Sequence, residues 1–126
     1  MNKARNLIAI VDDEESVRTA LRRLMRSADL DVETFPSGGE FLEALKTHRP
    51  DCVVLDLQMP QVNGFDVLSR LGQREVRIPV VVITGHDTPE ARTGALASGA
   101  AAYLRKPVDG SVLLDTIAAA IAGKKL

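Results

Sequence analysis

Residues 52–56 read CVVLD, four apolar residues followed by an aspartate. The run is rich in β-branched side chains and does not alternate between apolar and polar residues, which is typical of a strand covered on both faces. Residues 7–11 (LIAIV) and 79–84 (PVVVIT) share this pattern. We therefore expect three central strands of a parallel sheet, at residues 7–11, 52–55 and 79–84.

Two weaker strands are expected near the sheet edges. Residues 32–35 form a short run that follows Asp31 and contains Glu33, and residues 101–104 follow Gly99. Helical stretches separate all the strands, and we expect helices at residues 17–28, 39–46, 64–72, 89–98 and 111–122. Because parallel strands need crossover connections, the strict alternation of strand and helix predicts a doubly wound α/β domain with helices on both faces of the sheet.

The composition is that of one soluble globular domain. The chain has 126 residues, of which 45% are hydrophobic and 26% charged, and we expect a single domain over residues 1–126 without an output domain. A net charge of -1 gives no basic field that would attract nucleic acid or an anionic membrane. Cys52 is the only cysteine, and the sequence shows no signal peptide or membrane-spanning segment, so we expect a cytoplasmic protein.

Polar side chains cluster where the predicted strands end. They are Asp12 and Asp13 after the first strand, Asp56 at the end of the third, Thr84 at the end of the fourth and Lys106 after the fifth. In sheets of this kind, ligands collect at the carboxyl ends of the strands. Three carboxylates brought together repel one another unless they bind a cation, and an open acidic cluster favours Mg²⁺.

The same residues suggest phosphoryl transfer. A carboxylate beside a metal ion can attack phosphorus while the metal and a lysine neutralise the phosphoryl oxygens. Asp56 is the candidate nucleophile, Lys106 the cation and Thr84 a hydroxyl donor. Any one acidic residue at a strand end is commonly a turn or helix-cap residue, but the joint arrangement over four strands favours a site.

Four segments resemble the signatures of response-regulator receiver domains, in the family's order and with similar spacing. They are VDDEESVR (11–18), VVLDLQMPQVNGFDVL (53–68), PVVVITGHD (79–87) and AAYLRKPV (101–108). The resemblance covers essentially the whole chain. It implies a CheY-like fold in which a five-stranded parallel sheet has the strand order 2-1-3-4-5.

The resemblance also assigns the metal site and the phosphoacceptor. It implies that Asp12 and Asp13 are the metal-binding acidic pair and that Asp56 accepts the phosphoryl group. Gln58, two residues after Asp56, would contribute its backbone carbonyl to Mg²⁺.

The switch residues follow from the resemblance as well. It implies that Thr84 is the switch hydroxyl and that Tyr103 is a mobile aromatic whose position reports the state of Thr84. Lys106 would bind the phosphoryl group, and the peptide bond before Pro107 would be cis.

The resemblance further implies a histidine kinase or a phosphotransfer protein as phosphodonor. The segment ITGHD is most similar to receivers of FixJ- and NarL-type regulators, which usually precede a DNA-binding domain in a longer parent protein. Such receivers suggest a phosphorylation-dependent homodimer through the surface that begins at Pro89 and ends at Leu104. Arg92 and Arg105 would supply polar contacts there.

Two alternatives stay open. A non-phosphorylated pseudo-receiver scaffold would be marked by loss of Asp56, an acidic partner or Lys106, and none is lost. A magnesium-dependent phosphatase of the haloacid dehalogenase type would carry D-x-D after the first strand, whereas Asp12 and Asp13 are adjacent. We expect a signalling receiver that catalyses only its own phosphorylation and dephosphorylation.

Overall fold

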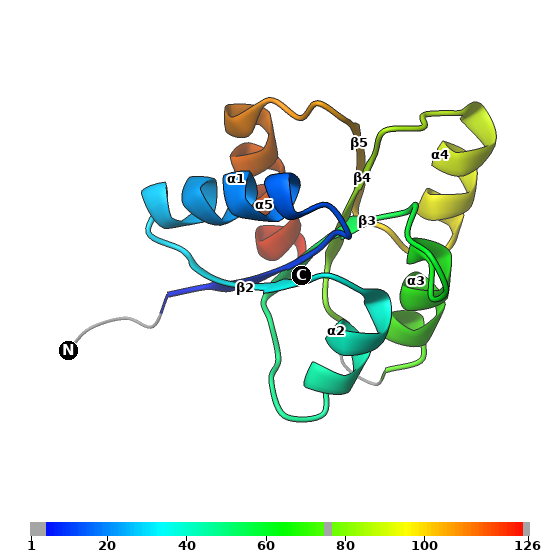
Figure 1. Cartoon of the computed structure of the whole chain (residues 1–126), viewed down its shortest axis with the longest axis horizontal. Coiled ribbons are helices and arrows are strands. Elements are labelled where there is room, and N and C mark those ends of the chain that lie inside the picture. Colours follow the sequence, from blue (N-terminus) through cyan, green and yellow to red (C-terminus); the bar gives the residue numbers. More distant parts are fainter. Residues whose placement is uncertain (1–4, 75–76, 125–126) are drawn as a thin grey trace.

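A single five-stranded sheet forms the centre of the molecule. The computed structural model describes residues 5–74 and 77–124. Its strands are β1 (Leu7–Val11), β2 (Asp31–Phe35), β3 (Cys52–Asp56), β4 (Val80–Thr84) and β5 (Ala102–Arg105). All neighbouring strands are parallel and lie in the order β2-β1-β3-β4-β5 (Figure 1). The predicted fold and strand order are confirmed.

Each strand is followed by a helix. The helices are α1 (Glu15–Ser27), α2 (Gly38–Ala44), α3 (Gly64–Gly72), α4 (Pro89–Ala97) and α5 (Gly110–Lys124). Side-chain oxygens of Ser37, Asn63 and Thr88 accept backbone N–H groups at the starts of α2, α3 and α4, which fixes where these helices begin. None of the described helices combines the length and the apolar character that a membrane crossing requires.

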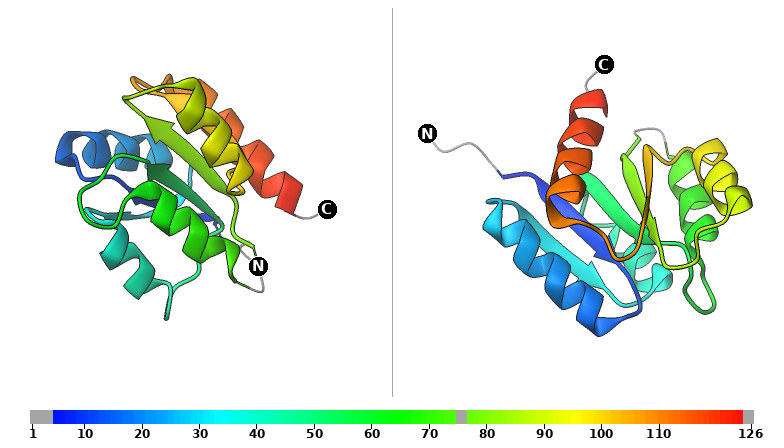
Figure 2. Two further views of the ribbon diagram at one scale, coloured as in Figure 1. Left: turned by 90° about the vertical axis from the view of Figure 1, so that its right-hand side faces the viewer. Right: turned by 90° about the horizontal axis from the view of Figure 1, so that it is seen from above.

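The helices cover both faces of the sheet. Ile8 and Ile10 of β1 pack with buried residues of α1 and α5, whereas Ala9 and Val11 face the cluster formed with α2, α3 and α4. Accordingly, α1 and α5 lie on one side of the sheet and the other three helices on the opposite side (Figure 1, Figure 2). Central strands with no exposed face explain the continuous apolar runs in the sequence.

Helix α4 has little apolar contact with the rest of the molecule. Ala95 is its only buried residue, and the side chain of Leu96 is 44% exposed. Burial of small side chains removes little apolar surface from water, so this helix is weakly held by the core. The contacts that fix its N-terminal end therefore matter for its position.

Candidate functional site

The parallel register brings the ends of neighbouring strands to one edge of the sheet. Val11 pairs with Leu55, so Asp12 and Asp56 follow adjacent positions on β1 and β3. Thr84 pairs with Arg105, which places Lys106 beyond the end of β5 next to Thr84. The backbone N–H of Lys106 donates to the carbonyl of Thr84 at 2.8 Å. Polar groups from these strands do meet at one rim.

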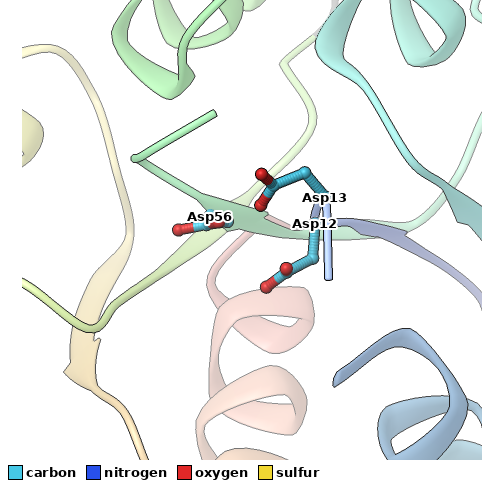
Figure 3. A group of neighbouring side chains, drawn as sticks. All are labelled: Asp12, Asp13 and Asp56. Atoms are coloured by element: carbon cyan, nitrogen blue, oxygen red, sulfur yellow. The ribbon is translucent and has the colours of Figure 1, made fainter. Parts of the chain in front are cut away.

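Three carboxylates form a compact cluster at this rim. One oxygen from each of Asp12, Asp13 and Asp56 lies within 4.8 Å of the others (Figure 3). Asp12 and Asp56 are buried, whereas Asp13 is exposed. The cluster therefore has two buried anionic groups at its base and one at the solvent-facing side.

The oxygen atoms of this cluster fit a hard divalent cation. Asp12 Oδ1 accepts the N–H of Glu14 at 2.9 Å, and the buried Asp12 Oδ2 lies 2.8 Å from the ammonium of Lys106. Buried carboxylates are costly unless positive charge lies close to them, and one ammonium faces three carboxylates here. Mg²⁺ prefers oxygen ligands and takes one or two carboxylates with several waters. The compact set of three carboxylate oxygens thus fits Mg²⁺.

Lys106 extends over the acidic cluster. Its Nζ lies 2.8 Å from Asp12 Oδ2, 3.3 Å from Glu14 Oε1 and 3.6 Å from Asp56 Oδ2. The shortest of these contacts is the ion pair with the buried carboxylate of Asp12. Burial lowers the pKa of Lys106, but the nearby carboxylates outweigh burial and raise it. The amine is therefore a stable cation.

The Asp56 carboxylate is an unusually basic group for an aspartate. Burial raises its pKa from 3.8 to about 6, and repulsion by Asp12 and Asp13 adds to this effect. A hydrogen bond from the N–H of Gln58 to Oδ1 (3.1 Å) and the charge of Lys106 act in the opposite direction. At neutral pH the Asp56 carboxyl is mostly ionised, yet its negative charge is poorly stabilised. The site should therefore attract a cation strongly.

Gly64 allows α3 to start directly against the strand that carries Asp56. A Cβ atom at this position would lie 2.5 Å from the Cα of Leu57 and 2.7 Å from the carbonyl oxygen of Asp56. The N–H of Gly64 donates to the carbonyl of Leu57 at 3.0 Å. The close approach of two backbone segments requires glycine here, and it holds the loop beside Asp56 in place.

The predicted switch residues are both buried. Thr84 is fully buried, and its Oγ1 accepts the N–H of His86 at 3.1 Å. Tyr103 is 6% exposed, and its hydroxyl donates to Asp87 Oδ1 at 3.0 Å. The predicted cis peptide bond between Lys106 and Pro107 is present.

Sequence reasoning assigned no role to three residues that contact these groups. Glu14 pairs with Lys106, and the guanidinium of Arg18 donates to the carbonyl oxygen of Asp12 at 2.8 Å. Glu14 and Arg18 are one helical turn apart next to the acidic pair, and this spacing could have indicated them. Asp87, the acceptor of the Tyr103 hydroxyl, carries no such signal because its role depends on the conformation of the loop.

Comparison with known proteins gives one consistent result. Residues 8–118 match the Response regulator receiver domain family. The crystal structure of a response regulator receiver protein from Burkholderia phymatum is 43% identical with a TM-score of 0.83, and the match covers 94% of this chain and 96% of that one.

Two curated relatives are longer than this chain. The DNA-binding transcriptional regulator NtrC of Klebsiella pneumoniae is 40% identical over 105 residues, which cover 83% of this chain and 22% of that protein. The response regulator protein TodT of Pseudomonas putida is 35% identical over 121 residues, which cover 96% of this chain and 53% of that protein. The chain thus spans about a fifth of the length of one relative and about half of the other.

Proposed function

The chain belongs to the response regulator receiver domain family of two-component signalling, and on that premise we propose that Asp56 accepts a phosphoryl group from a histidine kinase or a phosphotransfer protein. The observation that carries the proposal is the position of Asp56. Its basic carboxylate lies at the sheet edge with two further carboxylates and the Lys106 ammonium around it. This is the arrangement that a phosphorus nucleophile needs.

In the proposed reaction a carboxylate oxygen of Asp56 forms a bond to phosphorus. The bond between phosphorus and the imidazole nitrogen of the donor breaks, and the imidazole leaves with the electron pair. The ammonium of Lys106, 3.6 Å from Asp56 Oδ2, neutralises charge on the transferred group. The Thr84 hydroxyl donates a hydrogen bond to it.

Asp12, Asp13 and Asp56, with the backbone carbonyl of Gln58, would hold Mg²⁺. When bound, the ion supplies positive charge that offsets the charge of the phosphoryl oxygens. The all-carboxylate cluster and the raised pKa of Asp56 support this assignment. Arg18 holds the backbone carbonyl of Asp12, and Glu14 holds the ammonium of Lys106 at the edge of the cluster.

In this proposal, phosphorylation changes the surface through which the domain binds its partner. We infer that phosphorylation moves Thr84 and Tyr103 and promotes a homodimer through the surface that begins at Pro89 and ends at Leu104. The weak anchoring of α4 supports such a movement. Arg105 is exposed on this surface, whereas the Arg92 guanidinium already lies over the ring of Tyr103.

In this proposal the domain is the receiver of a cytoplasmic regulatory protein. The domain resembles receivers of FixJ- and NarL-type regulators, and in this proposal a longer parent protein supplies a separate DNA-binding output domain. A role in transcription is supported by the names of two relatives, the DNA-binding transcriptional regulator NtrC and the transcriptional regulatory protein TdiR of Thauera aromatica, which is 36% identical over 115 residues. The receiver itself does not bind nucleic acid, because the net charge of -1 supplies no basic surface field. It is not an enzyme with a separate substrate and catalyses only its own phosphorylation and dephosphorylation.

Beryllium fluoride, which mimics a phosphoryl group on a carboxylate, tests the proposal. With Mg²⁺ present, fluorine NMR should show a protein-bound signal in the wild type and in Asp115→Asn, an exposed control on α5. The signal should be absent from Asp56→Asn. A pseudo-receiver scaffold would give no bound fluorine signal in any variant. Steady turnover of an aryl phosphate would instead support the alternative of a magnesium-dependent phosphatase.

A further inference from the structure

A side-chain hydrogen bond ties the loop between β4 and α4 to β5. The hydroxyl of Tyr103 donates to Asp87 Oδ1 at 3.0 Å, across sixteen positions of sequence. Asp87 itself is exposed and directly precedes Thr88, the residue that caps α4. The bond therefore joins the start of α4 to the centre of β5.

A second charged residue holds the same tyrosine from α4. The guanidinium carbon of Arg92 lies 5.3 Å from the centroid of the Tyr103 ring, a distance at which a cation attracts an aromatic face. Asp87 thus engages the hydroxyl end of Tyr103 and Arg92 engages its ring. Because α4 buries only Ala95 and packs Ala91 in part against the core, these contacts add to what fixes its N-terminal end.

The loop is also bonded to the proposed switch hydroxyl. Thr84 Oγ1 accepts the N–H of His86, the residue next to Asp87. A shift of Thr84 Oγ1 towards Asp56 would draw the N–H of His86 with it and displace the adjacent carboxylate. Tyr103 and Thr84 are therefore connected through the backbone of two consecutive loop residues.

We propose that Asp87 is the positioning residue of Tyr103, and that Asp87 and Arg92 together form a latch that holds the tyrosine buried and links its position, through the loop, to that of Thr84. The part of this inference that concerns Thr84 rests on the proposed function. The latch itself does not, because its contacts are made within the loop, α4 and β5.

The latch is open to direct observation because Tyr103 is the only tyrosine and the chain has no tryptophan. Ultraviolet absorption and fluorescence therefore report on this one ring. Burial raises the pKa of Tyr103 above 10, and the hydrogen bond and charge of Asp87 raise it further, while a hydrogen bond from the backbone of Thr88 and the charge of Arg92 act in the opposite direction. Asp87 and Arg92 are the charged side chains that face the ring from the loop and from α4.

The first experiment compares the metal-free protein with Asp87→Ala, Asp87→Asn and Arg92→Gln. Loss of a charge-assisted hydrogen bond should shift the equilibrium between buried and exposed tyrosine by roughly tenfold. We expect Asp87→Ala to increase acrylamide quenching of tyrosine fluorescence and to lower the tyrosine titration midpoint towards 10. Asparagine keeps a neutral hydrogen-bond acceptor, so Tyr103 in Asp87→Asn should be partly protected from the quencher. Arg92→Gln should increase quenching without lowering the midpoint.

Glu90→Gln is the matched control, since it removes an exposed carboxylate from the first turn of the same helix. Its tyrosine signal should equal that of the wild type. If tyrosine in Asp87→Ala stays as protected as in the wild type, or if Glu90→Gln exposes it equally, the latch is refuted. Circular dichroism that matches the wild type shows that the variants are folded.

The second experiment adds beryllium fluoride and Mg²⁺ and follows tyrosine and fluorine signals together. In the wild type, binding at Asp56 should change the tyrosine signal. In Asp87→Ala the fluorine signal should persist while the tyrosine change is lost, and an undiminished tyrosine change would refute the latch as the connection. Absence of a bound fluorine signal in the wild type would refute the role of Asp56 and the coupling to Thr84, whereas the metal-free comparison alone decides whether Asp87 positions Tyr103.

Discussion

Replacement of the phosphoacceptor candidate should make the metal-free domain more stable. Asp56 is 3% exposed and lies beside two other carboxylates, and its pKa is raised from 3.8 to about 6. A raised pKa means that the folded protein holds the Asp56 proton more tightly than the unfolded chain does. The free energy of unfolding therefore falls as the pH rises from about 4 to about 6 and stays lower above that range.

The size of this effect follows from the pKa. One pKa unit corresponds to about 1.36 kcal/mol, so ionised Asp56 lowers the free energy of unfolding by about 3 kcal/mol at neutral pH. Asparagine removes the buried charge but also loses the attraction of Lys106, which is 3.6 Å away. We expect Asp56→Asn to gain about 1 to 3 kcal/mol at about pH 7.5, and almost nothing at about pH 4, where Asp56 is protonated.

Urea unfolding followed by circular dichroism, with a chelator present, measures this difference. Comparison of each variant with the wild type at the same pH cancels the contributions of other titrating groups. Asp115→Asn removes a carboxylate from the exposed face of α5 and should change the free energy of unfolding by less than about 0.5 kcal/mol. A variant at Asp56 that is no more stable than the wild type at neutral pH, or whose gain is equal at both pH values, would refute the reasoning.

Further predictions concern the metal, the loop and the dimer. Asp13→Asn should weaken Mg²⁺ binding by roughly tenfold because it removes one negative charge from the cluster, whereas Lys106→Ala should preserve or strengthen it, and calorimetry that shows equal effects would contradict separate roles. Gly64→Ala should lower the free energy of unfolding by about 1 to 3 kcal/mol in urea, since its Cβ would overlap backbone atoms, and an unchanged value would contradict the packing argument. Beryllium fluoride should promote dimers in sedimentation experiments, and charge reversal at Arg92 or Arg105 should weaken them. A protein that is monomeric in both states would exclude that surface.

Much of the fold could be predicted because its determinants are local in sequence. Continuous apolar runs identify β1, β3 and β4, since these strands are covered on both faces. Element boundaries differ from the predicted ones by two residues or fewer, and the starts of α3 and α4, which Asn63 and Thr88 cap, agree with the prediction. Asp12, Asp56, Thr84 and Lys106 could be brought together because the carboxyl ends of parallel strands share one edge.

The remaining features depend on loop conformation, which the pattern of apolar residues does not determine. Nothing in the sequence indicates that the hydroxyl of Tyr103 meets Asp87, because sixteen residues separate them. Gly64 is recognisable as a residue at a helix boundary, but only the structure shows that the backbone of Leu57 occupies the space of a side chain. The distances of Lys106 from three carboxylates likewise follow from its side-chain conformation rather than from its position after β5.

Phosphorylation by a small phosphodonor tests the central claim most directly. Incubation with acetyl phosphate and Mg²⁺, followed by intact-protein and peptide mass spectrometry, should show the mass of one phosphoryl group on the peptide that contains Asp56. The label should be lost without Mg²⁺ and in Asp56→Asn, and retained in Asp115→Asn. Equal labelling of Asp56→Asn, or a label found on another residue, would contradict the assignment of Asp56 as the phosphoacceptor.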